Sequence, residues 1–375
     1  DPAVVDPPGQ LASEIEGHVA RRVSTPRPEA SASDRRSGAG KLLGGYGREW
    51  TRRVTGSPAG AAGTAPGEGE PFYPPAPVGW GMPTADGYVL EDLTVVDLST
   101  FVTGGFCSLM LANQGADVIK VERPGAGDDI RHSGPPFIDG DSPYYWTVNY
   151  DKRSVELDLK SDAGLAALYD LVDEADVFLQ NFRPGTAERL GLDYDTLTEH
   201  NEDVIYCSIS AFGATGPWRE RPGYDLLVQG LSGIMDVTGE AGGDPVKVGL
   251  PQTDLITAMW AAFGIVCAVR RREHTDEGEY IDLGMLDAAL PWLTKQAGKT
   301  FAGEETERMG TRDPVLAPYQ TFETGDGYVN VAALNPKLWR GFCAAIGRED
   351  LPEDERFEEN ADRVEHMDAL ESEIE

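Results

Sequence analysis

Short apolar strands that alternate with helical stretches are the feature of this sequence that most limits its fold. From Leu90 onward, five segments predict buried or half-buried strands: 94–98, 116–121, 154–159, 176–180 and 204–209. An apolar helix through Ala112, entered by a Gly-Gly turn at 104–105, and an amphipathic helix over 162–174 capped by Ser161 separate some of them. This alternation predicts parallel βαβ units and therefore an α/β fold with an open, wound, mostly parallel sheet of Rossmann-like type.

The rest of the chain differs from this core on both sides. Two longer helices are predicted at 225–235 and 254–272, then a hairpin turn at 325–327, a helix at 336–346 and an acidic helical pattern around 364–374. We predict a large α/β domain over 89–300, and over 301–375 a linker with a smaller α+β domain whose C-terminal part is missing. Residues 1–88 hold 15 Gly and 12 Pro, which predicts a disordered extension or wrongly joined upstream sequence.

The net charge of the chain limits the kinds of partner that it can bind. It carries 64 acidic and 32 basic residues, a net charge of −32, which argues against nucleic acid or an anionic membrane as partner. Only 8 basic residues are Lys, yet 40% of the chain is apolar, so a core can form. In molar salt the Debye length is about 3 Å, so this composition predicts a halophilic protein.

The spacing of the cysteines and the length of the longest apolar run indicate whether the chain binds metal and where in the cell it lies. Four separate cysteines without a CxxC motif predict neither a zinc site nor disulfides, and we expect no metal. The longest apolar stretch, 255–269, is shorter than a membrane span, and the N-terminus lacks the pattern of a signal peptide. We therefore predict a cytoplasmic protein.

Common catalytic motifs are absent, but one acid stands in an informative place. The sequence has no GxGxxG after the first strand and no GxxxxGK[ST], GxSxG or HExxH. Asp254 leads into the most apolar helix, where free N–H groups and the helix dipole are expected to lower its pKa and keep it available as a nucleophile. By position alone, a structural cap is the commoner role of such an acid.

Further polar residues gather where strands end, at the edge where ligands of wound sheets bind. Arg123, Asn181 and Arg183 follow predicted strands, which favours an anionic ligand, although a lone Arg is commonly a surface ion-pair partner. Tyr224 and Asp225 precede a helix, where they either line a cleft or cap the helix.

Taken together, the motifs at 115–125, 149–154, 175–185 and 223–225 and Asp254 resemble family III coenzyme A transferases, the group of formyl-CoA transferase, carnitine CoA-transferase and α-methylacyl-CoA racemase. The resemblance runs from about 90 to 375. It implies Asp254 as a nucleophile that forms an aspartyl anhydride and then an aspartyl-CoA thioester. It also implies coenzyme A as co-substrate, with a CoA site formed by Arg123, Val148, Lys152, Asn181, Phe182 and Thr186.

The resemblance also indicates which reaction of the family is favoured. Val102 stands where formyl-CoA transferase has a glutamine, and that enzyme's glycine-rich loop is missing at 309–318, which argues against formyl and oxalate exchange. Tyr224 stands where the racemase branch needs His; because a tyrosine hydroxyl is a poor base at neutral pH, transfer is favoured over racemisation.

We therefore expect an acyl-CoA:carboxylate CoA-transferase, with Tyr224, Asp225 and Val102 beside the substrate. Arg312 is a candidate partner for the far carboxylate of a short dicarboxylic acid such as succinate or mesaconate. A 2-methylacyl-CoA racemase and a non-catalytic acyl-CoA-binding relative are the alternatives. The resemblance further implies a homodimer of interlocked ring-shaped subunits.

Overall fold

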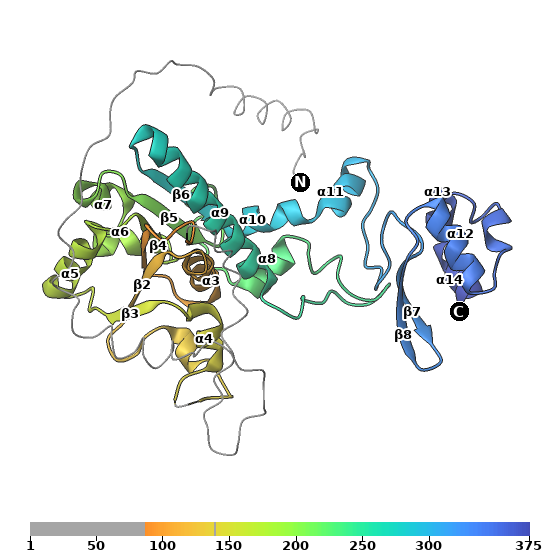
Figure 1. Ribbon diagram of the computed structural model, residues 1–375, viewed down its shortest axis with the longest axis horizontal. Helices are drawn as coiled ribbons and strands as arrows, with labels where there is room; N and C mark the ends of the chain where they lie inside the picture. Colours follow the sequence, from red (N-terminus) through yellow and green to blue (C-terminus); the bar gives the residue numbers. More distant parts are fainter. Residues whose placement is uncertain (1–86, 139) are drawn as a thin grey trace, which may run out of the picture. The chain divides into compact units, whose positions relative to one another are not determined.

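The structure is a computed structural model that describes residues 87–138 and 140–375. The predicted extension, residues 1–88, lies outside the described residues except for its last two. From Leu90 the chain alternates between strands and helices, as Figure 1 shows.

A six-stranded sheet forms the centre of the described chain. Its strand order is β3-β2-β1-β4-β5-β6 and every neighbouring pair is parallel, which confirms the predicted α/β fold class. The strands are β1 (Thr94–Asp97), β2 (Asp117–Glu122), β3 (Arg153–Glu156), β4 (Val177–Gln180), β5 (Ile205–Ser210) and β6 (Glu279–Gly284). The first five were predicted, whereas β6 was missed. β6 is an edge strand in which the exposed Tyr280 and Asp282 alternate with half-buried residues, so it lacks the apolar run of the central strands.

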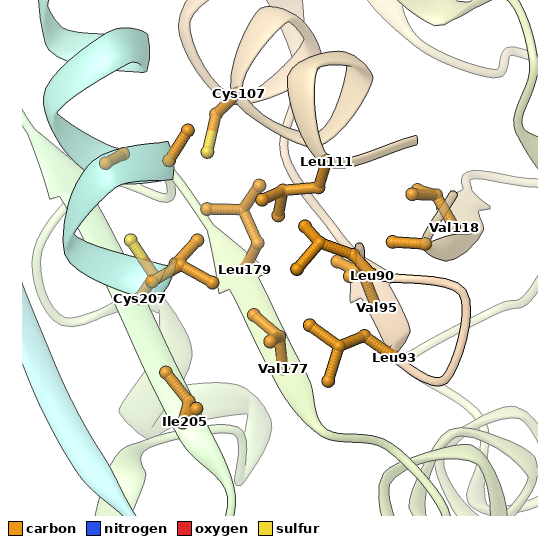
Figure 2. Close-up of a cluster of buried hydrophobic side chains, with 14 of the residues drawn as sticks. Leu90, Leu93, Val95, Cys107, Leu111, Val118, Val177, Leu179, Ile205 and Cys207 are labelled. Atoms are coloured by element: carbon orange, nitrogen blue, oxygen red, sulfur yellow. The ribbon is translucent and has the colours of Figure 1, made fainter. Parts of the chain in front are cut away.

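One face of the sheet is covered by α3 (Phe101–Ala112) and α9 (Gln252–Thr275). Figure 2 shows the core between them, where side chains from α3 and from alternate positions of β1, β4 and β5 meet. Because strand residues alternate between faces, Val95, Val177 and Ile205 all point to this side. α9 contributes mainly alanines here, which allow the helix to lie close to the sheet.

The predicted Gly-Gly turn at 104–105 is wrong, since α3 begins at Phe101 and both glycines lie within it. Their place is explained by close packing. A Cβ on Gly104 would lie 2.1 Å from the Cβ of Ser99, so the loop after β1 folds directly against this helix. Gly105 in turn faces Val148.

The opposite face is covered by α5 (Asp162–Val172), α6 (Thr186–Leu190) and α7 (Tyr194–His200). Leu168, Leu197 and Phe178 belong to the core on this side, and all three are fully buried. Ser161 caps α5 as predicted, because its hydroxyl accepts a hydrogen bond from the backbone N–H of Gly164. Helices on both faces make the sheet doubly wound.

α9 is the one helix in the described part of the chain that is long and apolar enough, by length and composition, to cross a membrane. Core helices of globular domains also meet that test, and α9 packs against α3, β5 and β6. At its C-terminal end, Arg272 forms an ion pair of 2.6 Å with Asp176, directly before β4. The C-terminal end of the helix therefore lies beside the amino end of β4.

The remaining helices of this region are α4 (Pro143–Asn149), α8 (Asp225–Leu231), α10 (Met285–Ala289) and α11 (Thr294–Phe301). α8 ends before the predicted residue 235, because Gly233 adopts a positive φ of 88° just beyond its C-cap.

Beyond residue 302 the chain forms a hairpin and three helices with a core of their own around the buried Trp339. β7 (Tyr319–Thr324) and β8 (Gly327–Ala332) are antiparallel and joined by the predicted turn. The helices are α12 (Pro336–Ala345), α13 (Asn360–Glu365) and α14 (Met367–Ile374). α12 and α14 agree with the predicted helical segments, whereas α13 was not predicted as a separate helix, and the predicted domain boundaries stay predictions.

Candidate active site

The centre of the sheet contains the point where the strand order reverses, between β1 and β4. The loops that leave these two strands run to helices on opposite faces and are tied together by Asn181. Its side-chain Oδ1 accepts a hydrogen bond from the backbone N–H of Thr100 at 2.9 Å, and its Nδ2 donates to the carbonyl of Thr100 at 2.7 Å. Asn181 therefore fixes the peptide that leads into α3.

A buried ionic network lies beneath this loop. Lys152 Nζ is 3.4 Å from Asp97 Oδ2 and donates to the Gly105 carbonyl and to Asn149 Oδ1, each at 2.8 Å. A second lysine, Lys120, lies 3.0 Å from the Asp128 carboxylate. All four charged residues of the network, Asp97, Lys120, Asp128 and Lys152, are at most 6% exposed.

The charges in this network compensate one another. Burial acts to raise the pKa of Asp97, but the charges of Lys120 and Lys152 and two serine hydroxyls outweigh it, so its pKa lies below the ordinary value. Burial lowers the pKa of Lys152 to about 8, against the opposing pull of Asp97. Asp97 thus stays ionised as part of the framework beneath α3.

Asp254 lies in the first turn of α9 and faces α3. Its Oδ1 accepts a hydrogen bond of 2.6 Å from the hydroxyl of Thr103, a residue that is only 5% exposed. No ion pair reaches the Asp254 carboxylate from any residue in 87–138 or 140–375, and its one charged neighbour of note, Asp225, is negative. The structure thus holds this carboxylate with a single hydroxyl.

The expected fall in the pKa of Asp254 is wrong. Its pKa is raised from 3.8 to about 6, because burial outweighs the lowering effect of the hydrogen bond from Thr103 and the negative charge of Asp225 adds to the rise. The N-cap of α9 is Pro251, so Asp254 is not the cap that its position suggested. Desolvation therefore outweighs the helix dipole at this site.

An apolar wall adjoins Asp254. Val102 and Val148, both predicted from the resemblance to contact ligand, pack in one cluster with Ile130 and Tyr145, and Leu255 joins this cluster directly after Asp254 in the chain. The one hydroxyl among these side chains, that of Tyr145, donates to Glu122 and not to Asp254.

Asp225 positions α9 against α8. Its Oδ1 accepts hydrogen bonds from the backbone N–H and the hydroxyl of Thr253, each at 2.9 Å, and its Oδ2 accepts one from Gln229. Asp225 therefore caps a helix, which was one of the two predicted roles, but the helix it caps is α9 and not its own helix α8. Tyr224, by contrast, is 63% exposed and packs edge-on against the ring of Phe101, with 6.2 Å between ring centroids.

Phe101 adopts a strained backbone. Its φ of 61° lies in the left-handed region, which is unfavourable for a residue with a bulky side chain. The Asp128 carboxylate holds the conformation by accepting a hydrogen bond of 3.1 Å from the Phe101 N–H. Such strain is found mainly where the surrounding structure fixes a functional loop.

A cleft opens at the carboxyl ends of β1, β2 and β4, and the loop at Thr100 belongs to its lining. Two predicted CoA-site residues, Arg123 and Phe182, belong to its lining: Leu98, Ser99, Thr100, Val121, Glu122, Arg123, Gly127, Asp128, Leu157, Leu159 and Phe182. Arg123 is exposed, forms an ion pair with Asp129 and donates to the carbonyl of Gly127. A cationic and an aromatic side chain at one cleft suit a nucleotide.

Four predicted site residues make contacts of another kind. Lys152 and Asn181 bond within the framework described above. Thr186 begins α6 and accepts a hydrogen bond from Arg189, and Arg312 forms ion pairs with Asp368 and Glu371. In the described part of the chain no contact joins Thr186 or Arg312 to Asp254, so their ligand roles stay predictions.

Thr103 was missed by the sequence reasoning, and so was Tyr144. Burial and then the charges of Asp254 and Asp225 raise the pKa of Tyr144, which places it close to both carboxylates. Nothing local to either residue signals the contact, because Thr103 and Asp254 are 151 positions apart. Among residues 87–138 and 140–375, no group of His, Cys, Asp and Glu is arranged to hold a metal ion.

Comparison with known proteins places this geometry in context. Residues 90–375 match CoA-transferase family III. The succinyl-CoA:mesaconate CoA-transferase of Haloarcula hispanica is 43% identical over 76% of this chain and 74% of the relative. The succinyl-CoA:glutarate CoA-transferase of Mus musculus is 37% identical over 75% of this chain and 65% of the relative. A crystal structure of a CAIB/BAIF family protein from Brucella suis is 40% identical, covers 76% of both chains and gives a TM-score of 0.67.

Proposed function

The chain belongs to CoA-transferase family III, and from that premise we propose that it moves coenzyme A from a short dicarboxylic acyl thioester to a free dicarboxylate. The names of two relatives support this substrate class, because one pairs succinyl-CoA with mesaconate and the other pairs it with glutarate. Both names join a four-carbon acyl donor to a short dicarboxylic acid, so succinyl-CoA is the first donor to test.

In the proposed mechanism Asp254 is the nucleophile. One of its oxygens attacks the donor carbonyl carbon, the carbon–sulfur bond breaks, and CoA leaves as a thiolate, which gives an aspartyl anhydride. The thiolate then attacks Cγ of Asp254, expelling the donor acid as a carboxylate and leaving an aspartyl-CoA thioester. The acceptor carboxylate attacks the same carbon and expels the CoA thiolate, which gives a second anhydride. The thiolate then attacks the acceptor carbonyl of this anhydride, so the new acyl-CoA forms and the Asp254 carboxylate is regenerated. No net proton is consumed, and the thioester bond is conserved.

The observation that carries this proposal is the state of the Asp254 carboxylate. It is desolvated, it lacks a cation, and a single hydroxyl bonds one of its two oxygens. A carboxylate left this way keeps an oxygen free to attack and is more nucleophilic than one held in an ion pair. The adjoining apolar wall also keeps water from the anhydride, which would otherwise be hydrolysed.

Coenzyme A is proposed to bind along the cleft at the ends of β1, β2 and β4. Arg123 and Phe182 line that cleft and would contact the nucleotide, while Val148 belongs to the wall near Asp254 and would face the pantetheine arm. Lys152 and Asn181 would act by holding the loop that separates the two parts of the site.

The test is to identify the residue that becomes acylated. The protein is incubated with succinyl-CoA, quenched with hydroxylamine and digested, and a hydroxamate is expected at Asp254 alone. Asp254→Asn should abolish the label, whereas Asp276→Asn, the matched change at the opposite end of α9, should keep it, because Asn suits the left-handed conformation of that C-cap. Solvent deuterium entering the acyl chain without any carboxylate acceptor would instead support the racemase alternative.

A homodimer is also proposed. Apolar side chains stand exposed on α8 and α9, namely Leu226, Leu227, Leu231, Met259, Trp260, Phe263 and Val266. A row of this kind on neighbouring helices suits burial against a second copy. Light scattering should give twice the chain mass, and Phe263→Glu should shift it toward the monomer; a monomeric parent protein would contradict the proposal.

The working environment is proposed to be a salt-rich cytoplasm. Residues 89–375 carry 54 acidic and 23 basic groups, a net charge of −31, whose repulsion is screened at molar ionic strength. Transferase activity should rise with KCl toward molar concentrations, and full activity in dilute buffer would count against this.

A further inference from the structure

The hydrogen bond between Thr103 and Asp254 distinguishes the two oxygens of the nucleophile. The Thr103 hydroxyl donates to Oδ1 at 2.6 Å, and no hydrogen bond to Oδ2 comes from the residues that the structure describes. Thr103 is buried in the first turn of α3, a turn fixed at Phe101 by Asp128 and packed at Gly104 against Ser99. The donor is therefore held in place before any substrate binds.

We propose that the Thr103 hydroxyl is a catalytic donor that reserves Oδ1 as the permanent carbonyl oxygen of Asp254 and leaves Oδ2 as the attacking atom. This proposal rests on the proposed function. Oδ2 forms the bond to the donor acyl carbon, and it departs with the donor acid when the thiolate attacks Cγ. Oδ1 stays on Cγ throughout, first in the anhydride and then in the thioester.

The charge that develops in these steps explains the value of the donor. When the thiolate, and later the acceptor carboxylate, adds to Cγ, the negative charge of each tetrahedral intermediate falls on Oδ1. The Thr103 hydroxyl already points at this oxygen, so it stabilises the charge without reorganisation. The attack of Oδ2 on the donor carbonyl places its charge on the substrate oxygen instead and gains nothing from Thr103.

Isotope transfer makes the assignment testable. In each turnover Cγ loses one oxygen to the departing acid and gains one from the incoming carboxylate. If the hydrogen bond from Thr103 prevents the carboxylate from rotating about its Cβ–Cγ bond between turnovers, only the oxygen at the Oδ2 position exchanges. Many turnovers with succinyl-CoA and an excess of fully ¹⁸O-labelled succinate should therefore place one ¹⁸O in Asp254 of the parent protein, as read by mass spectrometry of the peptide.

Thr103→Val removes the hydroxyl at nearly constant shape and should change both readouts. We expect Asp254 to take up two ¹⁸O atoms, because either oxygen can then attack, and kcat to fall by about 10²-fold, the usual loss for one oxyanion donor. Thr103→Ser keeps the hydroxyl and should return the uptake to one atom. Thr103→Ala serves as the second deletion where the valine variant does not fold.

Thr257→Val is the matched control. Thr257 is a buried threonine one turn further along α9, and its hydroxyl donates to the Thr253 carbonyl at 2.6 Å and not to Asp254. It should retain single-atom uptake. Two atoms in the parent protein, or one atom in both deletion variants, would overturn the role of Thr103. A parent protein that gains no ¹⁸O at Asp254 and forms no adduct there would instead overturn the proposed function.

Discussion

Two aspartates of this protein each accept a hydrogen bond from a hydroxyl of α3, and their pKa values are shifted in opposite directions. Asp97, at the end of β1, is surrounded by Lys120, Lys152 and two serine hydroxyls, and its pKa is lowered although it is fully buried. Asp254, at the start of α9, has one hydroxyl and a negative neighbour, and burial raises its pKa to about 6. The same side chain is thus a structural ion in one place and a candidate nucleophile in the other. Asp254 is only half-buried and Asp97 is fully buried, yet Asp254 has the raised pKa, so the difference follows from the partners.

The largest expected effect is the loss of CoA transfer when Asp254 is replaced. Asp254→Asn removes the nucleophile and leaves the shape, so CoA transfer should fall by at least about 10⁴-fold, as losses of covalent nucleophiles do. Transfer from succinyl-CoA to labelled glutarate measures it. The Asp276→Asn control should stay within about twofold, since ordinary surface changes cost little. Substantial transfer by Asp254→Asn would remove this residue from the mechanism.

On the Asp97 side the expected effect is on stability. Lys152→Met leaves Asp97 buried with one cation fewer, and breaking a buried pair in this way costs about 3–5 kcal/mol of unfolding free energy. Urea unfolding measures the loss. Lys160→Met makes the same change at an exposed site and should lie within about 0.5 kcal/mol of the parent protein. Equal stability of the two variants would show that Asp97 does not depend on Lys152.

A smaller effect of opposite sign is expected for the stability of Asp254→Asn. The pKa of Asp254 is about 6 in the folded protein and 3.8 without the fold, so its ionisation opposes folding as pH rises. At pH 8 the variant should be more stable than the parent protein, by up to about 3 kcal/mol from that pKa difference. The gain should vanish only below about pH 3, where the parent carboxylate is protonated in both the folded and the unfolded state. Thermal unfolding at the two pH values measures it, and a gain that is independent of pH would contradict the cause.

The smallest expected effect is the pH dependence of activity. Attack requires ionised Asp254, so kcat/KM should fall as pH drops through about 6, by about tenfold per pH unit below it. Asp97 keeps its charge over this range because its pKa is lowered, so the fold should not change. Circular dichroism at each pH checks this. Activity that is constant down to pH 5 would mean that the Asp254 carboxylate is better solvated than the structure shows.

The sequence allowed the central strands and the position of Asp254 to be predicted, because apolar periodicity and the approach to an apolar helix are local patterns. β6 was missed, since this half-buried edge strand is interrupted by Asp282 and carries no apolar run. The direction of the pKa of Asp254 was wrong for a related reason. A helix terminus can be recognised from a few residues, but desolvation depends on which distant segments cover the carboxylate.

The contacts of the site were the least predictable part. Thr103 meets Asp254 only because α3 and α9 lie side by side on one face of the sheet. The resemblance implied that Lys152 and Asn181 contact CoA, whereas the structure shows their polar atoms bonded to Asp97 and Thr100. Residue identity at a motif position therefore does not distinguish a ligand contact from an internal one.

The length of α9 has a mechanical consequence. From Asp254 to Arg272 the helix advances about 27 Å, at about 1.5 Å per residue. Its far end is anchored by Arg272 to Asp176, which leads into β4, while its near end carries Asp254, the candidate nucleophile. Because a helix is stiff, a tilt produced at the anchor is transmitted to the chemistry at the other end. Substitutions at the amino end of β4 can therefore change the orientation of the Asp254 carboxylate. They would do so without altering any residue that contacts the proposed substrate.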